Sequence, residues 1–388
     1  MDLSFIINEL GEDRDQYFNA VAPPIMQTSN FRFRRVDQLR SAFADEMSTY
    51  LYSRGLNPTV DILRKKLAAL DGAEDCLVFN SGAATIFAGV LAQVKSGDHI
   101  VSVQQPYTWA QRLFDQILPR FGVETTYVDG RRTENYFEAT RPTTTLYYME
   151  SPNSWDFALQ DLGAIAAYAR QKEIVTLIDN SYCTPLYQRP LEYGIDLAMQ
   201  TATKYIGGHS DTLGGVLSGS RESIKRIFDS EYLNIGSGIQ PFNAWMLLRG
   251  LRTLPARLER IVSSTHEVVQ YIKQHPVVDA VYYPHDPGFP QYDLARRQMA
   301  QAPGLFSFTV KAASRQQVVT FCESLQHILM AVSWGGFESL LLPRCASLQD
   351  AEFNPADAGH RMLRMYVGLE APAYLVADLD QAFRKAFA

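Results

Sequence analysis

The chain has 388 residues, a formal net charge of −6 and 46% hydrophobic residues. A chain of this size and composition buries a substantial core and divides into about two or three domains, which excludes a disordered protein. It has no long basic run and no apolar run that could span a bilayer, so neither nucleic acid nor a membrane is expected as a partner. The four cysteines form no CxxC pair and no signal peptide is recognisable, so we expect a cytoplasmic protein without a disulfide framework or a zinc site.

Residues 1–55 show little pattern of independent structure. Two prolines are followed by FRFRRVDQL and then by YLYSRGLNPT. We expect such a segment to form an arm that packs on its own chain or on a neighbouring copy. Within it, Arg54 precedes Gly55 in a turn. An arginine in a turn usually points to solvent, but it is also well shaped for bidentate phosphate binding.

From residue 59 onward, helices and strands alternate. Val60, Leu63, Leu67 and Leu70 recur at helical spacing, and Gly72 ends the helix. Short apolar runs then predict strands at 76–79, 99–103, 145–149 and 174–178, and intervening helices that end near residues 94, 118 and 170. Strands that alternate with helices predict a mostly parallel α/β sheet with both faces covered.

Polar side chains follow the predicted strands at the points where the strands end. In open α/β sheets, ligands bind beyond the carboxyl ends of the strands. The polar residues at these ends are Ser81, Tyr107, Ser154, Asp179 and Lys204. We therefore expect a functional site at this edge of the sheet.

Lys204 lies in a turn between two apolar runs, at 197–199 and 215–217. This pattern predicts a strand, a functional turn and a second strand. A lysine that is partly desolvated there can form a Schiff base, and the hydroxyls of Thr201 and Thr203 beside it could hold a phosphate. The alternative is a surface lysine in a glycine-rich loop.

The other strand ends offer complementary groups. Ser81, Gly82 and Ala83 open a helix with free amides for a phosphate, although an ordinary helix cap fits equally well. Tyr107 could stack on a planar ring or belong to the core. Asp179 could pair with a protonated heteroaromatic nitrogen or with an internal cation. Together, an amine, a carboxylate, a ring and a phosphate cradle are the parts that hold pyridoxal phosphate.

The pattern changes after about residue 250. Helices over 247–258 and 261–272 and strands over 305–310 and 363–368 predict a smaller α+β domain. In its last strand, Arg364 requires a partner, either an internal acid or a substrate carboxylate. We thus predict three parts, namely an arm over 1–55, a cofactor-binding α/β domain over 56–248 and an α+β domain over 249–388.

The motifs along the chain resemble the Cys/Met-metabolism family of pyridoxal-phosphate enzymes, which includes cystathionine synthases and lyases and methionine γ-lyase. The similar segments, in family order, are APPIMQTSNF, YLYSRGLNPT, FNSGAAT, QPYTWA, ESPNS, IDNSYCTP, TATKYIGGHSD, SWGGFESLLLP and LRMYVGLE. The resemblance implies the aspartate-aminotransferase-like fold, fold type I, and a homotetramer built from two active dimers.

The resemblance also implies roles for individual residues. Lys204 would attach the cofactor and carry protons, and Asp179 would hold the ring nitrogen protonated. Tyr107 would stack on the ring and, as a second catalytic residue, assist the leaving group. The residues implied to bind the cofactor phosphate are Ser81, Gly82, Ala83, Thr201 and Thr203, with Tyr52 and Arg54 from the neighbouring subunit. Those implied to contact an amino-acid substrate are Arg364, which would hold its α-carboxylate, and Ser333, Trp334, Ser154 and Tyr52.

The reaction type rests on two departures from the usual family pattern. Trp334 stands where enzymes of γ-chemistry commonly have leucine, and ESPNS replaces the usual Glu-Thr-Pro-x-Asn-Pro. Both are similar to bacterial cystathionine β-lyases. Trp109 occupies the place where methionine γ-lyases typically have cysteine. The resemblance therefore implies β-elimination of L-cystathionine to homocysteine, pyruvate and ammonia.

Three other functions remain open at this point. Within the family, the alternatives are a cystathionine γ-synthase or a γ-lyase. From another class, the alternative is a catalytically idle scaffold or regulator, which the intact Lys204, Asp179 and Arg364 disfavour. A nicotinamide enzyme is disfavoured because no GxGxxG follows an early strand.

Overall fold

The computed structural model describes residues 1–387. Contacts between Cα atoms divide the chain into two compact units. Unit 1 comprises residues 1–151, 159–207 and 211–252, and unit 2 comprises 152–158, 208–210 and the chain from residue 253 onward. The predicted domain boundary at 248–249 lies inside the helix α11 (Pro241–Arg252), and the boundary between the units lies at the end of that helix.

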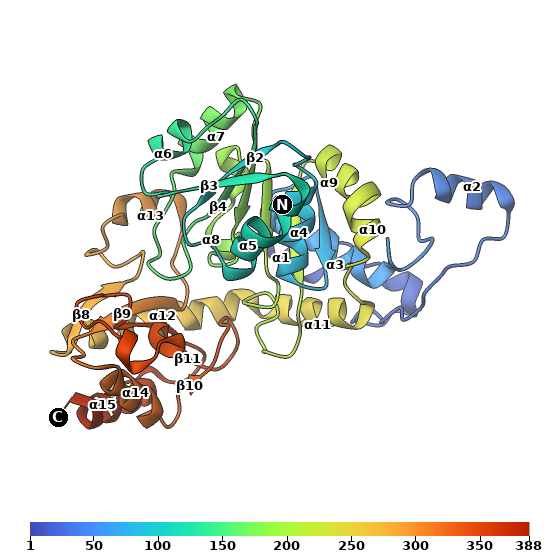
Figure 1. Cartoon of the computed structure of the whole chain (residues 1–388). Helices are drawn as coiled ribbons and strands as arrows, with labels where there is room; N and C mark the ends of the chain where they lie inside the picture. Colours follow the sequence, from blue (N-terminus) through green and yellow to red (C-terminus); the bar gives the residue numbers. More distant parts are fainter. Residues whose placement is uncertain (388) are drawn as a thin grey trace. The chain divides into compact units, whose positions relative to one another are not determined.

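Unit 1 is built on a seven-stranded sheet of order β1-β7-β6-β5-β4-β2-β3 (Figure 1). Its strands are β1 (Asp75–Phe79), β2 (His99–Val103), β3 (Glu124–Val128), β4 (Thr144–Glu150), β5 (Val175–Asp179), β6 (Leu197–Gln200) and β7 (Gly215–Gly219). Every strand runs parallel to the others except β7, which pairs antiparallel with both β1 and β6. This confirms the predicted, mostly parallel α/β sheet.

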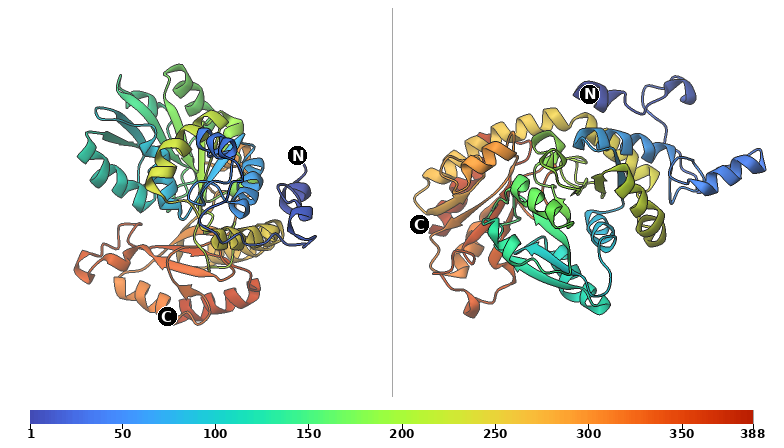
Figure 2. Two further views of the ribbon diagram at one scale, coloured as in Figure 1. Left: turned by 90° about the vertical axis from the view of Figure 1, so that its right-hand side faces the viewer. Right: turned by 90° about the horizontal axis from the view of Figure 1, so that it is seen from above.

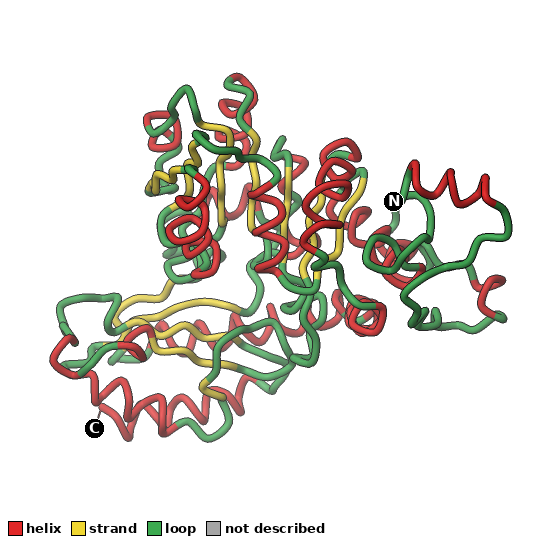
Figure 3. Tube along the Cα trace, turned by 45° about the vertical axis from the view of Figure 1, so that its right-hand side comes forward, coloured by secondary structure: helices red, strands yellow, loops and turns green. Residues whose placement is uncertain are grey.

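Helices cover both faces of this sheet, because its central strands are apolar on both sides (Figure 3). In β4, Leu146 and Tyr148 pack with α4, α5 and α9, whereas Tyr147 and Met149 pack with α6 and α7. The helices of unit 1 are α1 (Leu3–Asn8), α2 (Val36–Ala44), α3 (Pro58–Asp71), α4 (Gly82–Leu91), α5 (Thr108–Arg112), α6 (Glu134–Glu138), α7 (Leu162–Gln171), α8 (Thr184–Tyr187), α9 (Arg221–Ile227), α10 (Leu233–Ile235) and α11.

The arm that precedes α3 consists mostly of loop between short helices, and its α2 projects from the rest of unit 1 (Figures 1 and 2). Several of its large apolar side chains are exposed, with Phe18 at 99% and Val36 at 77%. Near its start the arm is held by Glu12, which is buried and forms ion pairs of 3.1 Å with both Lys66 and Arg252. One end of the arm is thus fixed, whereas its middle exposes an apolar surface.

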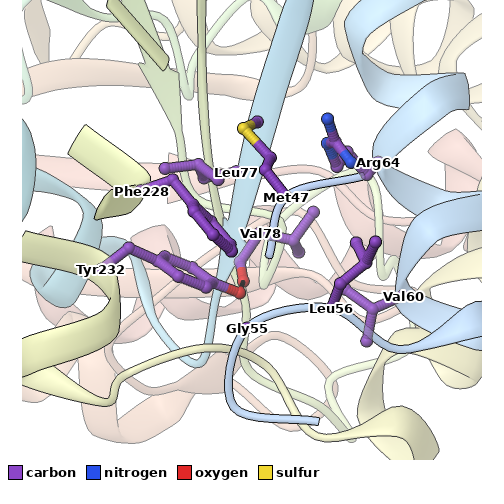
Figure 4. Close-up of a pocket in the computed structure, with 9 residues that line it drawn as sticks. All are labelled: Met47, Gly55, Leu56, Val60, Arg64, Leu77, Val78, Phe228 and Tyr232. Atoms are coloured by element: carbon purple, nitrogen blue, oxygen red, sulfur yellow. Dashed lines mark hydrogen bonds between the residues drawn. The ribbon is translucent and has the colours of Figure 1, made fainter. Parts of the chain in front are cut away.

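The end of the arm packs on the sheet at a small cavity (Figure 4). Side chains from the arm, α3, β1 and the turn after α9 converge there, namely Met47, Gly55, Leu56, Val60, Arg64, Leu77, Val78, Phe228 and Tyr232. The Tyr232 hydroxyl donates to the Val78 carbonyl at 3.0 Å, which ties this turn to β1. The cavity therefore belongs to the anchoring of the arm.

Unit 2 has a five-stranded sheet of order β10-β11-β12-β9-β8. Its strands are β8 (Val278–Tyr282), β9 (Leu305–Val310), β10 (Leu329–Met330), β11 (Leu340–Pro343) and β12 (Met362–Tyr366), and its helices are α12 (Leu254–Gln274), α13 (Tyr292–Gln298), α14 (Arg315–Ser324) and α15 (Pro372–Phe387). One sheet face packs on α14 and α15 through contacts of Phe308 with Phe321 and Phe383. This is the predicted α+β arrangement.

Two elements differ from the sequence expectation. The helix predicted over 247–258 is divided into two. α11 ends at Arg252 and the next helix begins at Leu254, with Pro255 in its first turn, where a proline is tolerated. The helix predicted up to residue 118 continues as a π-helical turn over Leu113–Ile117. Within residues 1–387, no helix is long and apolar enough to cross a membrane, and no group of three His, Cys, Asp or Glu side chains could hold a metal ion.

Candidate active site

Lys204 lies in the connection 201–214, which joins β6 directly to β7. The hydroxyls of Thr201 and Thr203 donate to the Gly214 carbonyl at 3.1 and 3.3 Å, and the Gly214 amide donates back to the Thr203 hydroxyl at 3.1 Å. These bonds close the turn at its base. Because β6 and β7 are buried along their whole length, the backbone of Lys204 is held on a rigid support.

The amino end of α4 faces this turn. The Ser81 hydroxyl accepts the Ala84 amide at 3.2 Å, whereas the amides of Gly82 and Ala83 have no partner within the helix. A Cβ on Gly82 would lie 2.6 Å from the Cβ of Thr201, so a larger residue does not fit here. The close approach brings the helix amides and the Thr201 hydroxyl to one place, which suits an anionic group.

Asp179 ends β5 and is buried. Burial raises the pKa of its carboxyl, while hydrogen bonds from Ser181 and the positive charge of Lys204 lower it. The Ser181 amide donates to Asp179 at 2.9 Å, and the Ser181 hydroxyl accepts the Thr201 amide at 2.8 Å. Burial is the larger effect, so the pKa of Asp179 lies above its usual value, and a nearby cation favours the charged form of this buried carboxyl.

Tyr107 precedes α5 and is about 40% exposed. Its amide donates to the Glu150 carboxylate at 2.6 Å, and Glu150 lies opposite Asp179 in the pairing of β4 with β5. The structure thus connects the predicted residues Gly82, Thr201, Asp179 and Tyr107 through a continuous series of contacts. Tyr107 remains accessible at the end of this series.

Ser181 and Glu150 were not predicted as members of the site. Each supports a predicted residue through one hydrogen bond. The Ser181 amide donates to the Asp179 carboxyl, and the Glu150 carboxylate accepts the Tyr107 amide. The only sequence signal was their position one or two residues past a strand end, in IDNS and YMES. That signal does not distinguish a supporting residue from an ordinary turn residue.

Tyr52 and Arg54 lie on the arm and are not part of this series of contacts. The Arg54 guanidinium carbon is 5.6 Å from the centroid of the Tyr52 ring, and Tyr52 is nearly half exposed. Trp109, on α5, is also exposed and contacts the Arg112 guanidinium at 4.8 Å from its ring centroid. The side chains of Tyr52, Arg54 and Trp109 are therefore exposed and can contact groups outside the series.

Unit 2 brings Arg364 and Ser154 together. The Nη1 atom of Arg364, on β12, donates to the Ser154 carbonyl at 3.1 Å. The guanidinium carbon of Arg364 also lies 4.9 Å from the centroid of the Trp155 ring. Ser154 therefore positions Arg364 through its backbone, beside an aromatic surface.

The loop that carries Ser333 and Trp334 is attached to the strand of Arg364. The Tyr366 hydroxyl donates to the Gly336 carbonyl at 2.8 Å, and the Leu369 amide donates to the Phe337 carbonyl at 2.8 Å. Ser333 has a left-handed backbone with φ of +79°, which is strained for a residue other than glycine. Such a conformation fixes the direction in which the loop presents Trp334.

Asp71, at the end of α3, is hydrogen-bonded to the two strands that flank the lysine turn. Its buried carboxylate accepts Gln200 Nε2 at 3.1 Å and the Ser218 hydroxyl at 2.5 Å, and Gln200 directly precedes Thr201. Burial raises the pKa of Asp71 to about 7, although these hydrogen bonds and Arg189 oppose the shift. The residue was not predicted, because α3 is distant from β6 in sequence.

This raised pKa predicts a pH-dependent cost of folding. Between the ordinary value of 3.8 and about 7, the folded state binds more protons than the unfolded state, so this group lowers stability as pH rises. We expect Asp71→Asn to gain stability relative to the parent over that range, by at most about tenfold in the unfolding constant per pH unit. Urea unfolding at several pH values measures this, with the exposed Asp229→Asn as control. A difference that does not vary with pH would contradict it.

Comparisons with known proteins agree on one family. The family model "Cys/Met metabolism PLP-dependent enzyme" matches residues 6–384. The chain belongs to this family. It is 35% identical to an L-methionine gamma-lyase of Treponema denticola, over 95% of this chain and 93% of that protein. It is 33% identical to a putative cystathionine beta-lyase of Rhizobium johnstonii, over 98% and 96%.

A solved structure of the same family gives the fold. The crystal structure of metB from Corynebacterium glutamicum is similar to this chain with a TM-score of 0.91 and 30% identity, covering 99% of this chain and 98% of that one. The chain therefore has the fold of the type I pyridoxal-phosphate enzymes, as the sequence predicted. Its cofactor is pyridoxal 5'-phosphate.

The residues of this family member fit the cofactor. Gly82 has no side chain, so α4 approaches Thr201 closely. The amides of Gly82 and Ala83, which have no partner within the helix, can then bind a phosphate beside the Thr201 hydroxyl. The buried Asp179 provides a carboxyl for a ring nitrogen, and the positive charge of Lys204 lowers its pKa, as a protonated ring nitrogen also would. A phosphate cradle, a buried carboxylate and an amine are the groups that this cofactor requires.

Proposed function

We propose that the protein is a pyridoxal-phosphate-dependent carbon–sulfur lyase that cleaves L-cystathionine by β-elimination to homocysteine, pyruvate and ammonia. The observation that carries the choice of β-elimination is Trp334, held in the strained loop after Ser333 that is hydrogen-bonded to the strand of Arg364. An indole on a loop that is bonded to the strand of the carboxylate-binding residue would restrict how a substrate side chain extends. The ESPNS segment, whose Ser154 carbonyl holds Arg364, supports the same choice.

Each predicted residue has a defined task in this proposal. Lys204 attaches the cofactor, and its Nζ removes the proton from the substrate Cα. Asp179 keeps the ring nitrogen protonated. Pyridoxal phosphate, when bound, withdraws electrons from the substrate Cα. The bond from Cβ to sulfur then breaks, and the departing sulfur takes up a proton to give homocysteine. The three-carbon remainder takes up water and gives pyruvate and ammonia.

The remaining residues bind and orient. The amides of Gly82 and Ala83 and the hydroxyls of Ser81, Thr201 and Thr203 hold the phosphate, and Tyr107 covers the ring. Arg364 binds the α-carboxylate of the substrate, a task suited to its planar fork of donors. Ser154, Ser333 and Trp334 bound the same part of the substrate site.

We also propose a homotetramer in which each active site is completed by a neighbouring subunit. The arm exposes apolar side chains such as Phe18 and Val36, which a second copy would cover. Tyr52 and Arg54 on the same arm would then bind the phosphate, and Tyr52 the substrate, in that neighbour. Subunits with different defects should therefore complement each other. The cytoplasmic location expected from the sequence stays a prediction.

A γ-lyase or a γ-synthase is the second candidate. The similarity to proteins named methionine gamma-lyase and cystathionine gamma-lyase favours the former. An idle scaffold is the candidate from another class. It is disfavoured because Lys204, Asp179 and Thr201 are joined by the contacts described above.

Product analysis tests the proposed reaction. Purified protein incubated with L-cystathionine should release pyruvate and homocysteine in equal amounts, because β-elimination leaves three carbons on the keto acid. The same assay with methionine and homoserine esters serves as comparison. Formation of 2-oxobutyrate instead of pyruvate would identify a γ-lyase, and cystathionine formed from a homoserine ester would identify a γ-synthase. A protein that forms no product from any of them would be the idle scaffold.

A further inference from the structure

A second arginine lies beside Arg364 in unit 2. The guanidinium carbon of Arg344 is 5.5 Å from the centroid of the Trp155 ring, and that of Arg364 is 4.9 Å from the same centroid. The two cations are therefore no further apart than the sum of these distances. Trp155 brings together two positively charged groups that are separated by twenty residues in sequence.

The pairing of β11 with β12 places both arginines on the same face of the sheet. Arg344 directly follows β11, and its Nη1 atom approaches the Met362 sulfur at 4.0 Å. Met362 and Arg364 are two residues apart on β12 and therefore share a face. The opposite face carries Leu363, which pairs with the Phe308 that packs on α14 and α15.

The face that carries the arginines includes two polar residues of the neighbouring strand. Ser307 and Thr309 on β9 lie opposite Arg364 and Met362. Directly opposed residues in an antiparallel pair project to the same side. Their hydroxyls are buried and have no hydrogen-bond partner among the described residues. This side of the sheet therefore combines polar groups with Met362 and Leu342, in contrast to the aromatic side.

Electrostatics favours an anion at each arginine. An aromatic ring attracts a cation, but two guanidinium groups over one ring also repel each other. Arg344, Arg364 and Trp155 are each only partly buried, so a solute can reach this cluster. A single substrate carboxylate on Arg364 neutralises one of the two charges. A second carboxylate, at the other end of the same substrate, neutralises the other.

We propose that Arg344 is a specificity-determining residue that binds the distal carboxylate of the substrate, while Trp155 positions both guanidinium groups. The substrate class is then a thioether amino acid with a carboxylate at each end, in preference to one with a single carboxylate. The inference rests on the proposed function, in which Arg364 binds the α-carboxylate. It adds the residue that binds the second carboxylate of such a substrate, and with it a cause for the preference over monocarboxylate thioethers.

The test compares a dicarboxylate and a monocarboxylate substrate on matched variants. The holoenzyme is assayed for pyruvate from L-cystathionine and from S-ethyl-L-cysteine, because both carry the leaving sulfur on Cβ. We expect Arg344→Gln to lower kcat/KM for cystathionine by about tenfold to a hundredfold, mainly through KM, because a charge-assisted contact is lost. Turnover of S-ethyl-L-cysteine, which has a single carboxylate, should stay within about threefold, which also shows that the variant is folded.

Three further variants separate the roles. Arg344→Lys keeps the charge but loses the fork of donors, so the loss for cystathionine should be intermediate. Trp155→Leu should raise KM for all thioethers and Trp155→Phe should restore it, because the ring holds Arg364 as well. Arg384→Gln, on an exposed helix position of the same unit, should change nothing.

Two results would overturn the inference while leaving the lyase intact. One is an equal loss for both substrate types in Arg344→Gln, which indicates a structural role. The other is no loss for cystathionine. If the parent enzyme forms no 2-oxo acid from any thioether, the proposed function itself fails, and the inference fails with it.

Discussion

Replacement of Lys204 by alanine is expected to lower kcat for the elimination by about a thousandfold or more. Proton transfer by a positioned side chain alone contributes about 10²–10⁴-fold, and the same amine also attaches the cofactor. The turn 201–214 is closed by hydrogen bonds to Gly214 between two buried strands. A lysine elsewhere in the chain is therefore not brought to the same place.

The measurement combines kinetics with labelling. Release of 2-oxo acid gives the rate, and borohydride reduction followed by peptide mass analysis gives the lysine that carries the cofactor. Lys95→Ala, whose side chain is 82% exposed, is the control and should keep its activity. Cofactor found on a peptide that lacks residue 204 would refute the assignment.

The same variant examines the shared active site. Subunits of Lys204→Ala keep an intact arm, and subunits of Arg54→Ala keep an intact lysine. If the arm completes the neighbouring site, a mixture reassembled from the two should recover part of the parent activity. Activity no greater than that of the separate variants would show that Arg54 acts within its own subunit or not at all.

Replacement of Asp179 by asparagine is expected to lower kcat by about 10²–10³-fold, the usual effect of removing one preorganised electrostatic group. Asparagine keeps the size but loses the negative charge. Burial already disfavours the charged carboxyl, and Ser181 and the Lys204 cation favour it. A protonated ring nitrogen is a second nearby cation and, like Lys204, lowers the pKa of Asp179. The negative charge of Asp179 and the protonation of the ring therefore stabilise each other.

Steady-state rates and the cofactor content of each variant provide the readout. Asp179→Glu restores the charge and should recover part of the rate, which a purely structural role would not explain. The exposed Asp229→Asn is the control for loss of a surface carboxylate. Full activity of Asp179→Asn with normal cofactor content would rule out the proposed role.

The sequence predicted those features that depend on local pattern. The apolar runs ending at Asp179 and before Thr201 are the strands β5 and β6, and Ser81 caps α4 as its side-chain type favours. The α/β class followed from the alternation of such runs. The individual site roles remain predictions, which the proximity of the residues supports.

The features that escaped prediction depend on contacts between distant segments. Asp71 bonds Gln200, and Arg344 contacts Trp155, across well over a hundred residues in each case. Neither pair has a local signature, because a single buried carboxylate or a surface arginine occurs in many settings. The same holds for β3, an edge strand with a partly exposed face that lacks a strong apolar run.

The reversed strand β7 constrains the order in which the site is assembled. β1 lies at the edge of the sheet, and in the described part of the chain its strand partner is β7, which lies between β1 and β6. The chain completes β1 at residue 79 but supplies β7 only at 215–219. We therefore expect the amino end of α4, which is proposed to bind the phosphate, to reach the lysine turn only after this late strand is inserted. On that proposal, cofactor binding follows a long-range folding step of high contact order, and a nascent chain that stops before residue 219 should not bind the cofactor.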